Sequence, residues 1–288
     1  MSFDVLMSVY FREEAANLQR ALESVWDEQT LKPDAIVIVK DGPLTAPLDE
    51  VIERWAQRLP QVVRIKALPK NLGLGPALTA GLELCQSEWV ARMDSDDVSL
   101  PQRFAEQMAY LSQHPECSVL GAWIAEFDRD EAQSGSLRRV PTEHAEILKF
   151  SRWRSPINHP SVVFRRRDVL AEGSYHGVLF FEDYDLWTRL LARGYRFANL
   201  PRVLVKMRAG NAQLARRGGR GYFGLELSFL RRLRQRGILS WFDFVVAVVA
   251  KGGVRILPLG LRGQIYRTLL RKRVDGGTDE HGSGSANV

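Results

Sequence analysis

Three acidic side chains crowd the segment "VARMDSDDVSLP" (residues 90–101), namely Asp94, Asp96 and Asp97. Carboxylates repel one another, so a folded protein keeps them together only where something offsets the repulsion. Because Asp94 and Asp96 are two residues apart after an apolar run, a turn can point both toward one Mg²⁺ or Mn²⁺ ion, which accepts carboxylate oxygen and substrate phosphate. The structural alternative is that Asp97 or Ser99 caps the helix that follows. Both interpretations stay open on the spacing alone.

A second acidic pair, Glu182 and Asp183, lies in "FFEDYDLW" (residues 180–187). The helix dipole favours negative charge in a first helical turn, so a structural role is one interpretation. The functional interpretation is that one carboxylate, not bound to metal, accepts a proton from an attacking hydroxyl. Aromatic neighbours could form a platform for a sugar ring: Phe180, Phe181, Tyr184 and Trp187. His159, in "INHPS", has no partners at the spacing of a zinc site.

The apolar runs around these groups predict the elements that position them. We expect strands at residues 3–10, 35–40, 62–68 and 88–93, with helices between them at residues 14–28, 47–59 and 75–84. The continuous apolar run "AIVIVK" is typical of a strand buried on both faces. Strands that alternate with helices predict an α/β fold with a mostly parallel central sheet flanked by helices.

Two acidic groups follow strands directly in this arrangement, Asp41 in "DG" and the "DSDD" of residues 94–97. Ligands of parallel sheets bind outside the carboxyl ends of the strands, so both groups should lie on one rim. Farther along the chain, the pattern predicts helices at residues 101–115 and 182–194 and a strand at residues 118–127.

The composition is that of a folded protein, with 45% hydrophobic and 26% charged residues among 288. Cys85 and Cys117 have neither metal-binding nor disulfide spacing, so we expect packed thiols in a reducing compartment. The N-terminal residues lack the basic start of a signal peptide, and no run of about 18 apolar residues predicts a transmembrane helix.

Charge is distributed unevenly along the chain. Residues 202–273 hold 17 Lys and Arg against Glu226 and Asp243, a net charge of +15, which leaves −9 for the rest of a chain whose net charge is +6. The stretch "ILSWFDFVVAVVA" (residues 238–250) has aromatic residues near many arginines, as in helices that lie in a membrane interface. Packing on the rest of the chain and a dimer contact are alternatives. Nucleic-acid binding is disfavoured because no recognised motif accompanies the charge.

In their order, these motifs resemble those of inverting glycosyltransferases of the family-2 type with the GT-A nucleotide-sugar fold, and within them the bacterial exopolysaccharide and amylovoran-type enzymes. The resemblance covers about residues 3–210. "SVYFREE" is similar to the family's "PTYN.E", "VKDGP" to "VDDGS", and "ARMDSDD" to the DxD metal motif. "PKNLGLGPALTAGL" resembles the segment under the nucleotide, "NHPS" the acceptor-side loop and "FEDYDLWTRLLARG" the ED motif. The chain departs from the family at Phe11, Lys40 and Pro43.

The resemblance implies a role for each of these motifs. Asp96, with Asp94 directly or through water, would hold Mn²⁺ or Mg²⁺ against the diphosphate of a nucleotide-sugar, and Asp183 would be the catalytic base. The implied nucleotide-sugar-binding residues are Ser8, Tyr10, Glu14, Asp41, Asn71, Gly73, Arg92, Asp94 and Ser95. Contacts with the acceptor or the diphosphate are expected of His159, Glu182, Trp187 and Arg208. Asp41 lies where the family binds the uracil edge, which favours UDP- or dTDP-sugars.

Together these inferences predict a catalytic domain over residues 1–210, a basic amphipathic helical extension over residues 211–274 and a disordered tail over residues 275–288. The expected function is inverting, metal-dependent sugar transfer to a saccharide or lipid-linked saccharide in bacterial surface polysaccharide biosynthesis. We expect a cytoplasmic protein that contacts the inner face of the membrane through residues 211–273 and binds no nucleic acid. A metal-dependent nucleotidyltransferase or phosphohydrolase is the alternative activity.

Overall fold

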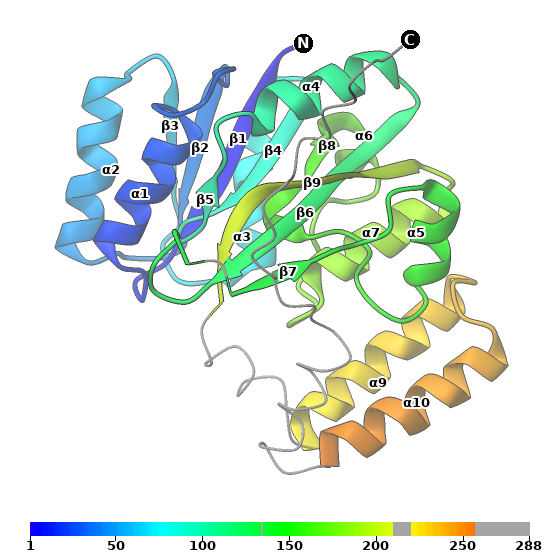
Figure 1. The fold of residues 1–288 in the computed structure, drawn as a ribbon. Helices are drawn as coiled ribbons and strands as arrows, with labels where there is room; N and C mark the ends of the chain where they lie inside the picture. Colours follow the sequence, from blue (N-terminus) through cyan, green and yellow to red (C-terminus); the bar gives the residue numbers. More distant parts are fainter. Residues whose placement is uncertain (134, 210–219, 257–288) are drawn as a thin grey trace, which may run out of the picture.

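Four parallel strands form one half of the central sheet in the computed structural model, which describes residues 1–133, 135–209 and 220–256 (Figure 1). In spatial order they are β3 (Val63–Ala67), β2 (Ala35–Lys40), β1 (Phe3–Val9) and β4 (Trp89–Asp94). Each neighbouring pair is parallel. The alternation of strands and helices along the sequence therefore predicted this half of the sheet correctly.

The other half of the sheet is mixed in direction. Beyond β4 the order is β8 (Val163–Arg165), β6 (Cys117–Phe127), β9 (Arg196–Arg208) and β5 (Val98–Ser99), and β7 (Ser136–Arg138) pairs with β6. The β6–β9 pair is parallel, whereas β4–β8, β6–β8, β6–β7 and β5–β9 are antiparallel. The sheet is thus parallel where the predicted nucleotide site lies and mixed elsewhere.

Strand β9 has no counterpart among the strands expected from the sequence. Pro201 interrupts its apolar pattern, and proline within a run argues against a strand because it cannot donate to the ladder. The structure places Pro201 at a register irregularity, between Leu200 opposite Ala122 and Val203 opposite Trp123. The strand therefore continues past the proline by leaving it out of the pairing.

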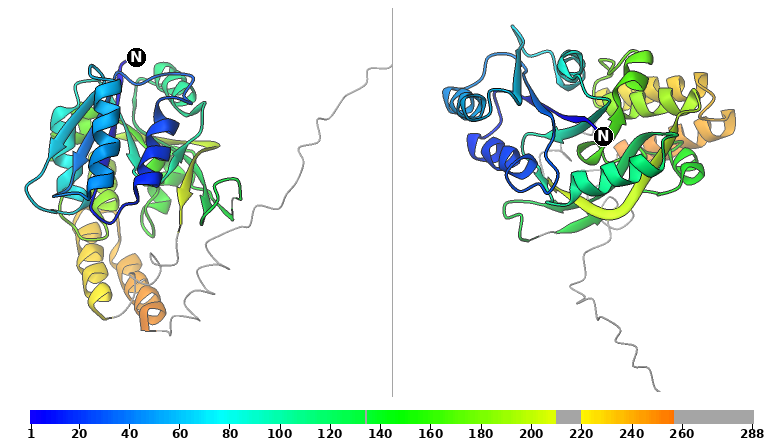
Figure 2. Two further views of the ribbon diagram at one scale, coloured as in Figure 1. Left: turned by 90° about the vertical axis from the view of Figure 1, so that its left-hand side faces the viewer. Right: turned by 90° about the horizontal axis from the view of Figure 1, so that it is seen from above.

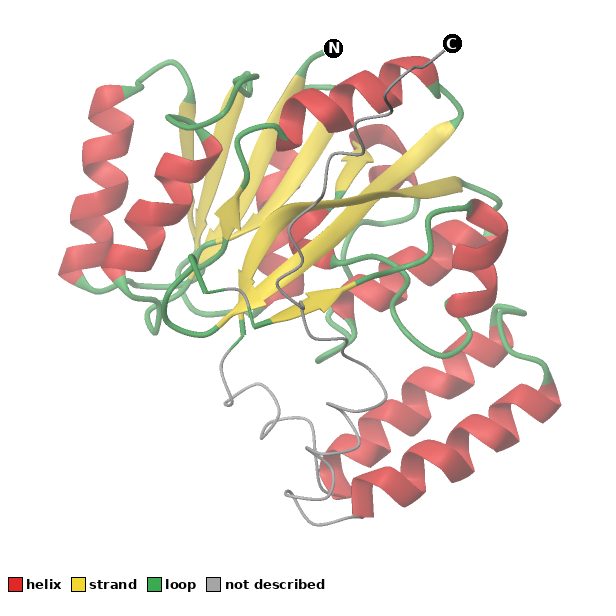
Figure 3. Cartoon of the chain, viewed as in Figure 1, coloured by secondary structure: helices red, strands yellow, loops and turns green. Residues whose placement is uncertain are grey.

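Helices cover both faces of the sheet (Figure 3). Their bounds are α1 (Ala15–Val25), α2 (Ala46–Arg58), α3 (Leu74–Leu84), α4 (Arg103–Gln113), α5 (His144–Phe150), α6 (Arg166–Ala171) and α7 (Glu182–Ala192), and a 3₁₀ turn spans His159–Ser161. Val5 and Met7 of β1 pack with α1, α2 and α4, whereas Leu6 packs with α3 and α7. Because successive side chains of a strand point to opposite faces, one strand contributes to both apolar layers.

Two further helices, α9 (Arg220–Gln235) and α10 (Trp241–Ile256), form a C-terminal hairpin beside α5 and α7 (Figures 1 and 2). Phe229 of α9 stacks on Phe181, with ring centroids 4.7 Å apart, and contacts Tyr184 at 4.8 Å. Lys251 of α10 pairs with Glu226 of α9 at 3.2 Å. Helix α9 therefore packs on the rest of the chain, whereas the alternatives that the sequence left open concern residues 238–250, in α10 and the turn before it.

The C-terminal hairpin falls within the basic helical extension predicted for residues 211–274. Residues 211–219 and 257–274 of that extension lie outside the described residues, as does the predicted tail, residues 275–288. Among the helices that the structure describes, none has the length and apolar character needed to cross a membrane.

Candidate active site

The carboxyl ends of β1, β2 and β4 bring predicted site residues to one edge of the sheet. Ser8 lies opposite Asp94 in the register of β1 and β4. Asp41 follows β2 directly, and the acidic turn, residues 94–97, begins at the last residue of β4. Tyr10 follows β1 with an exposed ring. The strand order thus places these groups on one rim, as the sequence predicted.

The carboxylates of the acidic turn lie close together. One oxygen from each of Asp94, Asp96 and Asp97 lies within 4.8 Å of the others. Arg92, buried in β4, binds both oxygens of Asp94 through its guanidinium. Burial, together with the charges of Asp94 and Glu13, raises the pKa of Asp96 to about 7. The turn therefore gathers more negative charge than Arg92 alone offsets.

Asp97 is buried and belongs to this cluster rather than to a helix cap. Its Oδ1 accepts a hydrogen bond from the backbone N–H of Arg208 at 2.8 Å, whereas its buried Oδ2 has no hydrogen-bond partner. Neither Asp97 nor Ser99 caps α4, whose N-cap residue is Gln102. Burial and the neighbouring carboxylates raise the pKa of Asp97 well above its usual value. A buried oxygen without a partner is costly, so this cluster of hard oxygen ligands fits a Mg²⁺ or Mn²⁺ ion.

A second buried arginine, Arg103 of α4, supports the strand that carries the turn. Its Nη2 donates to the backbone oxygen of Arg92 at 2.7 Å, and its Nε donates to Oε1 of Gln107 at 3.2 Å. Burial and the charge of Arg92 lower the pKa of Arg103 to about 9. Through this arginine, α4 holds the end of β4 in place.

Two side chains from other elements brace the acidic turn. Ser95 Oγ donates to Oε2 of Glu13, which lies in the turn after β1, at 2.9 Å. Arg208, the last residue of β9, donates from Nε to the backbone oxygen of Asp96 at 3.3 Å, and its guanidinium lies over the ring of Phe127. Arg208 therefore lies against the acidic turn, where a contact with a diphosphate was expected.

Asp41 shapes the segment that precedes α3. Its Oδ1 accepts a hydrogen bond from Leu72 N–H at 2.7 Å, and its Oδ2 accepts one from Gly73 N–H at 3.0 Å. Asn71 Nδ2 donates to the backbone oxygen of Asp41 at 3.3 Å. Gly73 has φ of +89° immediately before the helix, a conformation that residues with a Cβ rarely adopt. Both side-chain oxygens of Asp41 hold this loop, so the contact between Asp41 and the base of a nucleotide stays a prediction.

The second acidic pair occupies the first turn of α7, as the sequence predicted. Oδ2 of Asp183 accepts a hydrogen bond from Ser155 Oγ at 3.2 Å. Glu182 lies against Gly75 in the first turn of α3, where a Cβ on the glycine would come within 3.2 Å of Glu182 Cγ. Trp187 is fully buried in the core, so it is not placed to contact an acceptor. The start of α7 therefore adjoins the segment shaped by Asp41.

Tyr175 lies within electrostatic range of both acidic groups. Burial raises its pKa, and the charges of Asp183 and Asp94 add to the rise although Arg92 opposes it. Its hydroxyl lies 3.0 Å from Nε2 of His159. Burial lowers the pKa of His159 well below its usual value, so this imidazole is neutral near pH 7. An uncharged His159–Tyr175 pair thus adjoins the acidic turn and the start of α7.

Three residues of this site were missed by the sequence analysis. Glu14 is exposed at the start of α1, and Glu13 contacts the acidic turn in its place. In "PTYN.E" the acidic residue is the third after the tyrosine, a spacing that matches Glu13 and would have identified it. Asp97 was considered as a cap, and Tyr175 carried no sequence signal because it comes from an irregular segment before α7.

A parallel half-sheet with an acidic turn at its carboxyl edge, and a further carboxylate at the start of a helix, is the arrangement expected of a GT-A glycosyltransferase. The model of the family described as "Glycosyl transferase family 2" matches residues 4–173, more than half of the chain, and the protein belongs to this family. It is 45% identical over 268 residues to the amylovoran biosynthesis glycosyltransferase AmsE of Erwinia amylovora, covering 92% of this chain and 97% of the relative.

Other relatives agree with this assignment. The chain is 34% identical over 270 residues to the Escherichia coli UDP-Gal:alpha-D-GlcNAc-diphosphoundecaprenol beta-1,3-galactosyltransferase, covering 94% of this chain and 97% of the relative. Among solved structures, Staphylococcus aureus TarS in complex with UDP-GlcNAc superposes with a TM-score of 0.66 at 15% identity, covering 92% of this chain and 78% of the other. The mannosyltransferase PcManGT of Pyrobaculum calidifontis, in complex with GDP-Man and Mn²⁺, gives 0.58 at 18% identity, over 86% and 68% of the two chains. These two structures support the fold.

Proposed function

We propose that the protein transfers a sugar from a UDP- or dTDP-sugar to a hydroxyl group of a lipid-linked saccharide, with inversion, in the biosynthesis of a bacterial surface polysaccharide. The observation that carries the proposal is that the structure has both an acidic turn suited to a metal ion and a separate carboxylate, Asp183. Both lie within electrostatic range of Tyr175. The names of the relatives support the substrate class, since one acts in amylovoran biosynthesis and one on a diphosphoundecaprenol-linked sugar.

Asp183 acts as the general base in this proposal. Its Oδ2 is held by Ser155, which orients the carboxylate so that the other oxygen can accept the proton of an acceptor hydroxyl. The acceptor oxygen attacks the anomeric carbon from the face opposite the nucleotide, and the bond to the diphosphate breaks. A single displacement of this kind inverts the configuration at the anomeric carbon. Positioning of the two substrates supplies much of the acceleration.

The acidic turn would hold the metal ion. Asp96 and Asp97 offer carboxylate oxygens, and Asp94 would share its carboxylate between the ion and Arg92. A bound Mn²⁺ or Mg²⁺ ion neutralises charge on the leaving diphosphate. The guanidinium of Arg208 lies against the same turn, and we propose that it contacts the diphosphate.

The proposed binding site for the nucleotide-sugar consists of the residues at the carboxyl edge of the sheet and the loop before α3. We propose that the base lies over the loop of Asn71 and Gly73, close to Asp41, with Ser8 and Tyr10 on the other side. Arg92 and Ser95 would contribute by fixing the acidic turn. The UDP-GlcNAc complex of the structural neighbour supports a uridine nucleotide.

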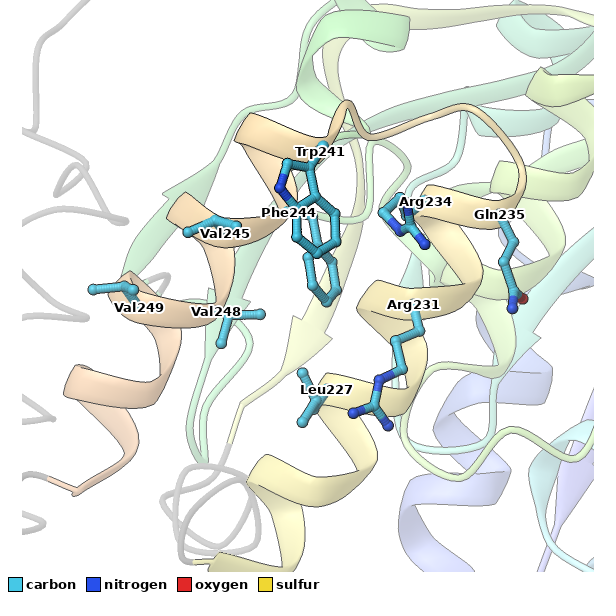
Figure 4. Close-up of a pocket in the computed structure, with 9 residues that line it drawn as sticks. All are labelled: Leu227, Arg231, Arg234, Gln235, Trp241, Phe244, Val245, Val248 and Val249. Carbon is cyan, nitrogen blue, oxygen red and sulfur yellow. The ribbon is translucent and has the colours of Figure 1, made fainter.

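Membrane contact is the second part of the proposal, and we place it on the C-terminal hairpin at the inner face of the cell membrane. Helix α10 exposes large apolar side chains, with Trp241 64%, Phe242 76% and Val249 70% exposed. A groove of about 410 Å³ between α9 and α10 is lined by Arg231 and Arg234 on the α9 side (Figure 4). Among the described residues, neither arginine is paired with a carboxylate. Apolar and basic groups in this arrangement suit an anionic lipid surface.

The Asp183→Asn variant tests the proposed reaction. We expect it to bind UDP in the presence of Mn²⁺ as the wild type does, while turnover falls by about a hundredfold or more because the base is lost. Turnover is measured as nucleotide release from UDP-galactose, UDP-GlcNAc, dTDP-glucose and GDP-mannose with a lipid diphosphate-linked N-acetylglucosamine.

The matched control is Glu146→Gln, which removes an exposed carboxylate from the first turn of another helix, α5. This control separates the loss of a base from the loss of a favourable helix-dipole contact. Full activity of Asp183→Asn would show that another group accepts the proton.

A further inference from the structure

The buried carboxylate of Asp185 has no part in the proposed chemistry, yet it joins the helix that carries Asp183 to the C-terminal hairpin. We infer that Asp185 and Arg236 form a positioning pair: the hairpin holds α7 through this pair and thereby sets where Asp183 meets the acceptor hydroxyl. The inference rests on the proposed role of Asp183 as the base.

Asp185 is fully buried and lies among three arginines and His176. Its Oδ2 accepts a hydrogen bond from Arg189 Nε at 2.9 Å and lies 3.5 Å from His176 Nδ1. Its Oδ1 accepts one from Arg236 Nη2 at 2.7 Å and lies 4.0 Å from Arg232 Nη1. A carboxylate without solvent contact depends on such partners, because an unpaired buried charge is strongly unfavourable.

The two arginines that contact Asp185 directly have different roles. Arg189 lies one turn farther along α7, so its bond to Asp185 is internal to the helix. Arg236 directly follows α9, in the turn of the C-terminal hairpin, and its Nη1 also donates to Thr188 Oγ1 at 3.0 Å. Arg236 thus binds two residues of α7 at once with a planar, rigid group. It therefore fixes α7 relative to the C-terminal hairpin, which Arg189 cannot do.

The position of Asp185 relative to Asp183 suits this role. Residues two apart in an α-helix lie about 200° apart around the axis, so the two carboxylates face opposite sides of α7. Asp183 faces Ser155 in the site, whereas Asp185 faces the hairpin. The ring of Phe181, just before the helix, stacks on Phe229 of α9. The hairpin therefore holds the first turn of α7 from the side that the acceptor does not approach.

The same cluster also holds the segment that contains Tyr175. Arg189 donates to the backbone oxygens of Glu172 and Ser174, the latter at 2.5 Å. Ser174 has φ of +60°, and its hydroxyl lies 3.1 Å from Thr79 Oγ1 of α3. Thr79 also donates to the backbone oxygen of Tyr175 at 3.1 Å. A shift of α7 would therefore move both Asp183 and the segment that lies between α7 and α3.

The test compares Arg236→Gln and Arg236→Lys in the full-length protein. We expect Arg236→Gln to lower kcat by about tenfold to a hundredfold, because small misplacements of a catalytic group have effects of this size. The donor KM and the Kd for UDP with Mn²⁺ should stay within about twofold of the wild type, since the acidic turn is untouched. Arg236→Lys keeps the charge and should recover part of kcat.

The matched control is Arg202→Gln, which removes an arginine from an exposed pair with Glu106 of α4. If Arg236→Gln does not fold, Thr188→Val removes one acceptor of the same guanidinium and should lower kcat by a smaller factor at unchanged KM. An unchanged kcat in a folded variant, or an equal loss of kcat and UDP affinity, would overturn the inference.

The outcome is separable from that of the proposed function. If Asp183→Asn is inactive while Arg236→Gln has normal kcat, the base assignment stands and the positioning pair is rejected. If Asp183→Asn retains activity, the base assignment fails, and with it the inference, whatever Arg236→Gln does.

Discussion

At the scale of single residues, the carboxylates of the acidic turn differ in what already binds them. Arg92 binds Asp94, and the backbone N–H of Arg208 binds one oxygen of Asp97. We expect Asp96→Ala to weaken UDP binding in Mn²⁺ to the level that the wild type shows in chelator. Calorimetric titration of UDP with Mn²⁺ and with chelator checks this, with the exposed Asp130→Ala as control. UDP affinity that is unchanged in Mn²⁺ would locate the ion elsewhere.

The same turn predicts how metal binding depends on pH. Burial raises the pKa of Asp96 to about 7 and that of Asp97 well above its usual value. An aspartate in the unfolded chain has a pKa of about 3.9, so the folded, metal-free protein keeps the protons of Asp96 and Asp97 up to a higher pH than the unfolded chain does. The stability that these groups contribute is present at low pH and is lost as pH rises toward about 7.

A metal ion competes with the protons for the carboxylates of Asp96 and Asp97, so it should stabilise the fold more at a pH at which both carboxylates are ionised. We expect saturating Mn²⁺ to raise the melting temperature more at pH 8 than at pH 6. Comparing the increments with and without metal at each pH cancels the effect of other groups, such as the buried His159. In Asp96→Asn the increment should be small at both values. An increment that is equal at pH 6 and pH 8 would contradict the prediction.

A residue of the site could be predicted only where its spacing or its place next to a strand or helix shows in the local sequence. The positions of Asp94, Asp96 and Asp183, at a strand end or at a helix start, could be predicted because spacing and apolar pattern are visible in the sequence. Trp187 was misjudged because aromatic residues at a helix start look alike whether they face the core or a ligand. The roles of Asp97 and Tyr175 depend on long-range contacts with β9 and with His159, which no local pattern encodes.

At the scale of elements, the segment before α3 depends on the backbone of Gly73. Its φ of +89° and ψ of 168° lie in a region that is essentially limited to glycine, although a Cβ there would meet no neighbouring atom. We expect Gly73→Ala to cost about 1–3 kcal/mol through backbone strain alone. Because Asp41 holds this loop, relief of the strain should also displace it and weaken UDP binding.

Gly177→Ala is the matched control, since a Cβ at Gly177 also meets no neighbour and its φ is not in the positive range. Chemical denaturation gives the stability change, and titration with UDP and Mn²⁺ gives the affinity change. Equal effects of the two variants would show that the backbone conformation of Gly73 is not what the loop requires.

The sequence predicted elements well where apolar patterns are long and uninterrupted. The first four strands and the helices between them match within a few residues, and β1, β2 and β4 are buried on both faces, whereas the edge strand β3 is partly exposed. The short strands β5 and β7 and the proline-containing β9 were not predicted. Their pairing is determined by β6 and by the register irregularity at Pro201, so it is a property of the sheet rather than of the local sequence.

At the scale of the whole molecule, the uneven charge of the sequence has a structural counterpart. Several cations of the C-terminal hairpin are used internally: Arg236 binds Asp185, and Lys251 binds Glu226. Arg231 and Arg234 line the groove beside α10 instead, with Arg234 over the ring of Trp241 at 4.9 Å. Packing of α9 on the rest of the chain and the proposed membrane contact are therefore compatible, because Arg236 serves the first and Arg231 and Arg234 serve the second.

The difference between the cations paired inside the protein and those that line the groove predicts which substitutions weaken binding to lipid. Burying a large apolar side chain contributes about 1.5–3 kcal/mol, so Phe242→Ser should reduce partitioning onto phosphatidylglycerol vesicles by about tenfold or more. Arg231→Gln and Arg234→Gln should each reduce it by about fivefold, and added salt should remove this part of the affinity. Co-sedimentation with phosphatidylglycerol and phosphatidylcholine vesicles measures both effects.

The control is Ile65→Ser, which removes an exposed apolar side chain from β3, far from the hairpin in sequence and on another element. The Phe242→Ser protein should keep its affinity for UDP and Mn²⁺, since α10 does not contribute to the acidic turn. If Phe242→Ser and Ile65→Ser bind vesicles equally well, the apolar face of α10 does not meet the membrane, and a second protein surface becomes the better candidate for what covers it.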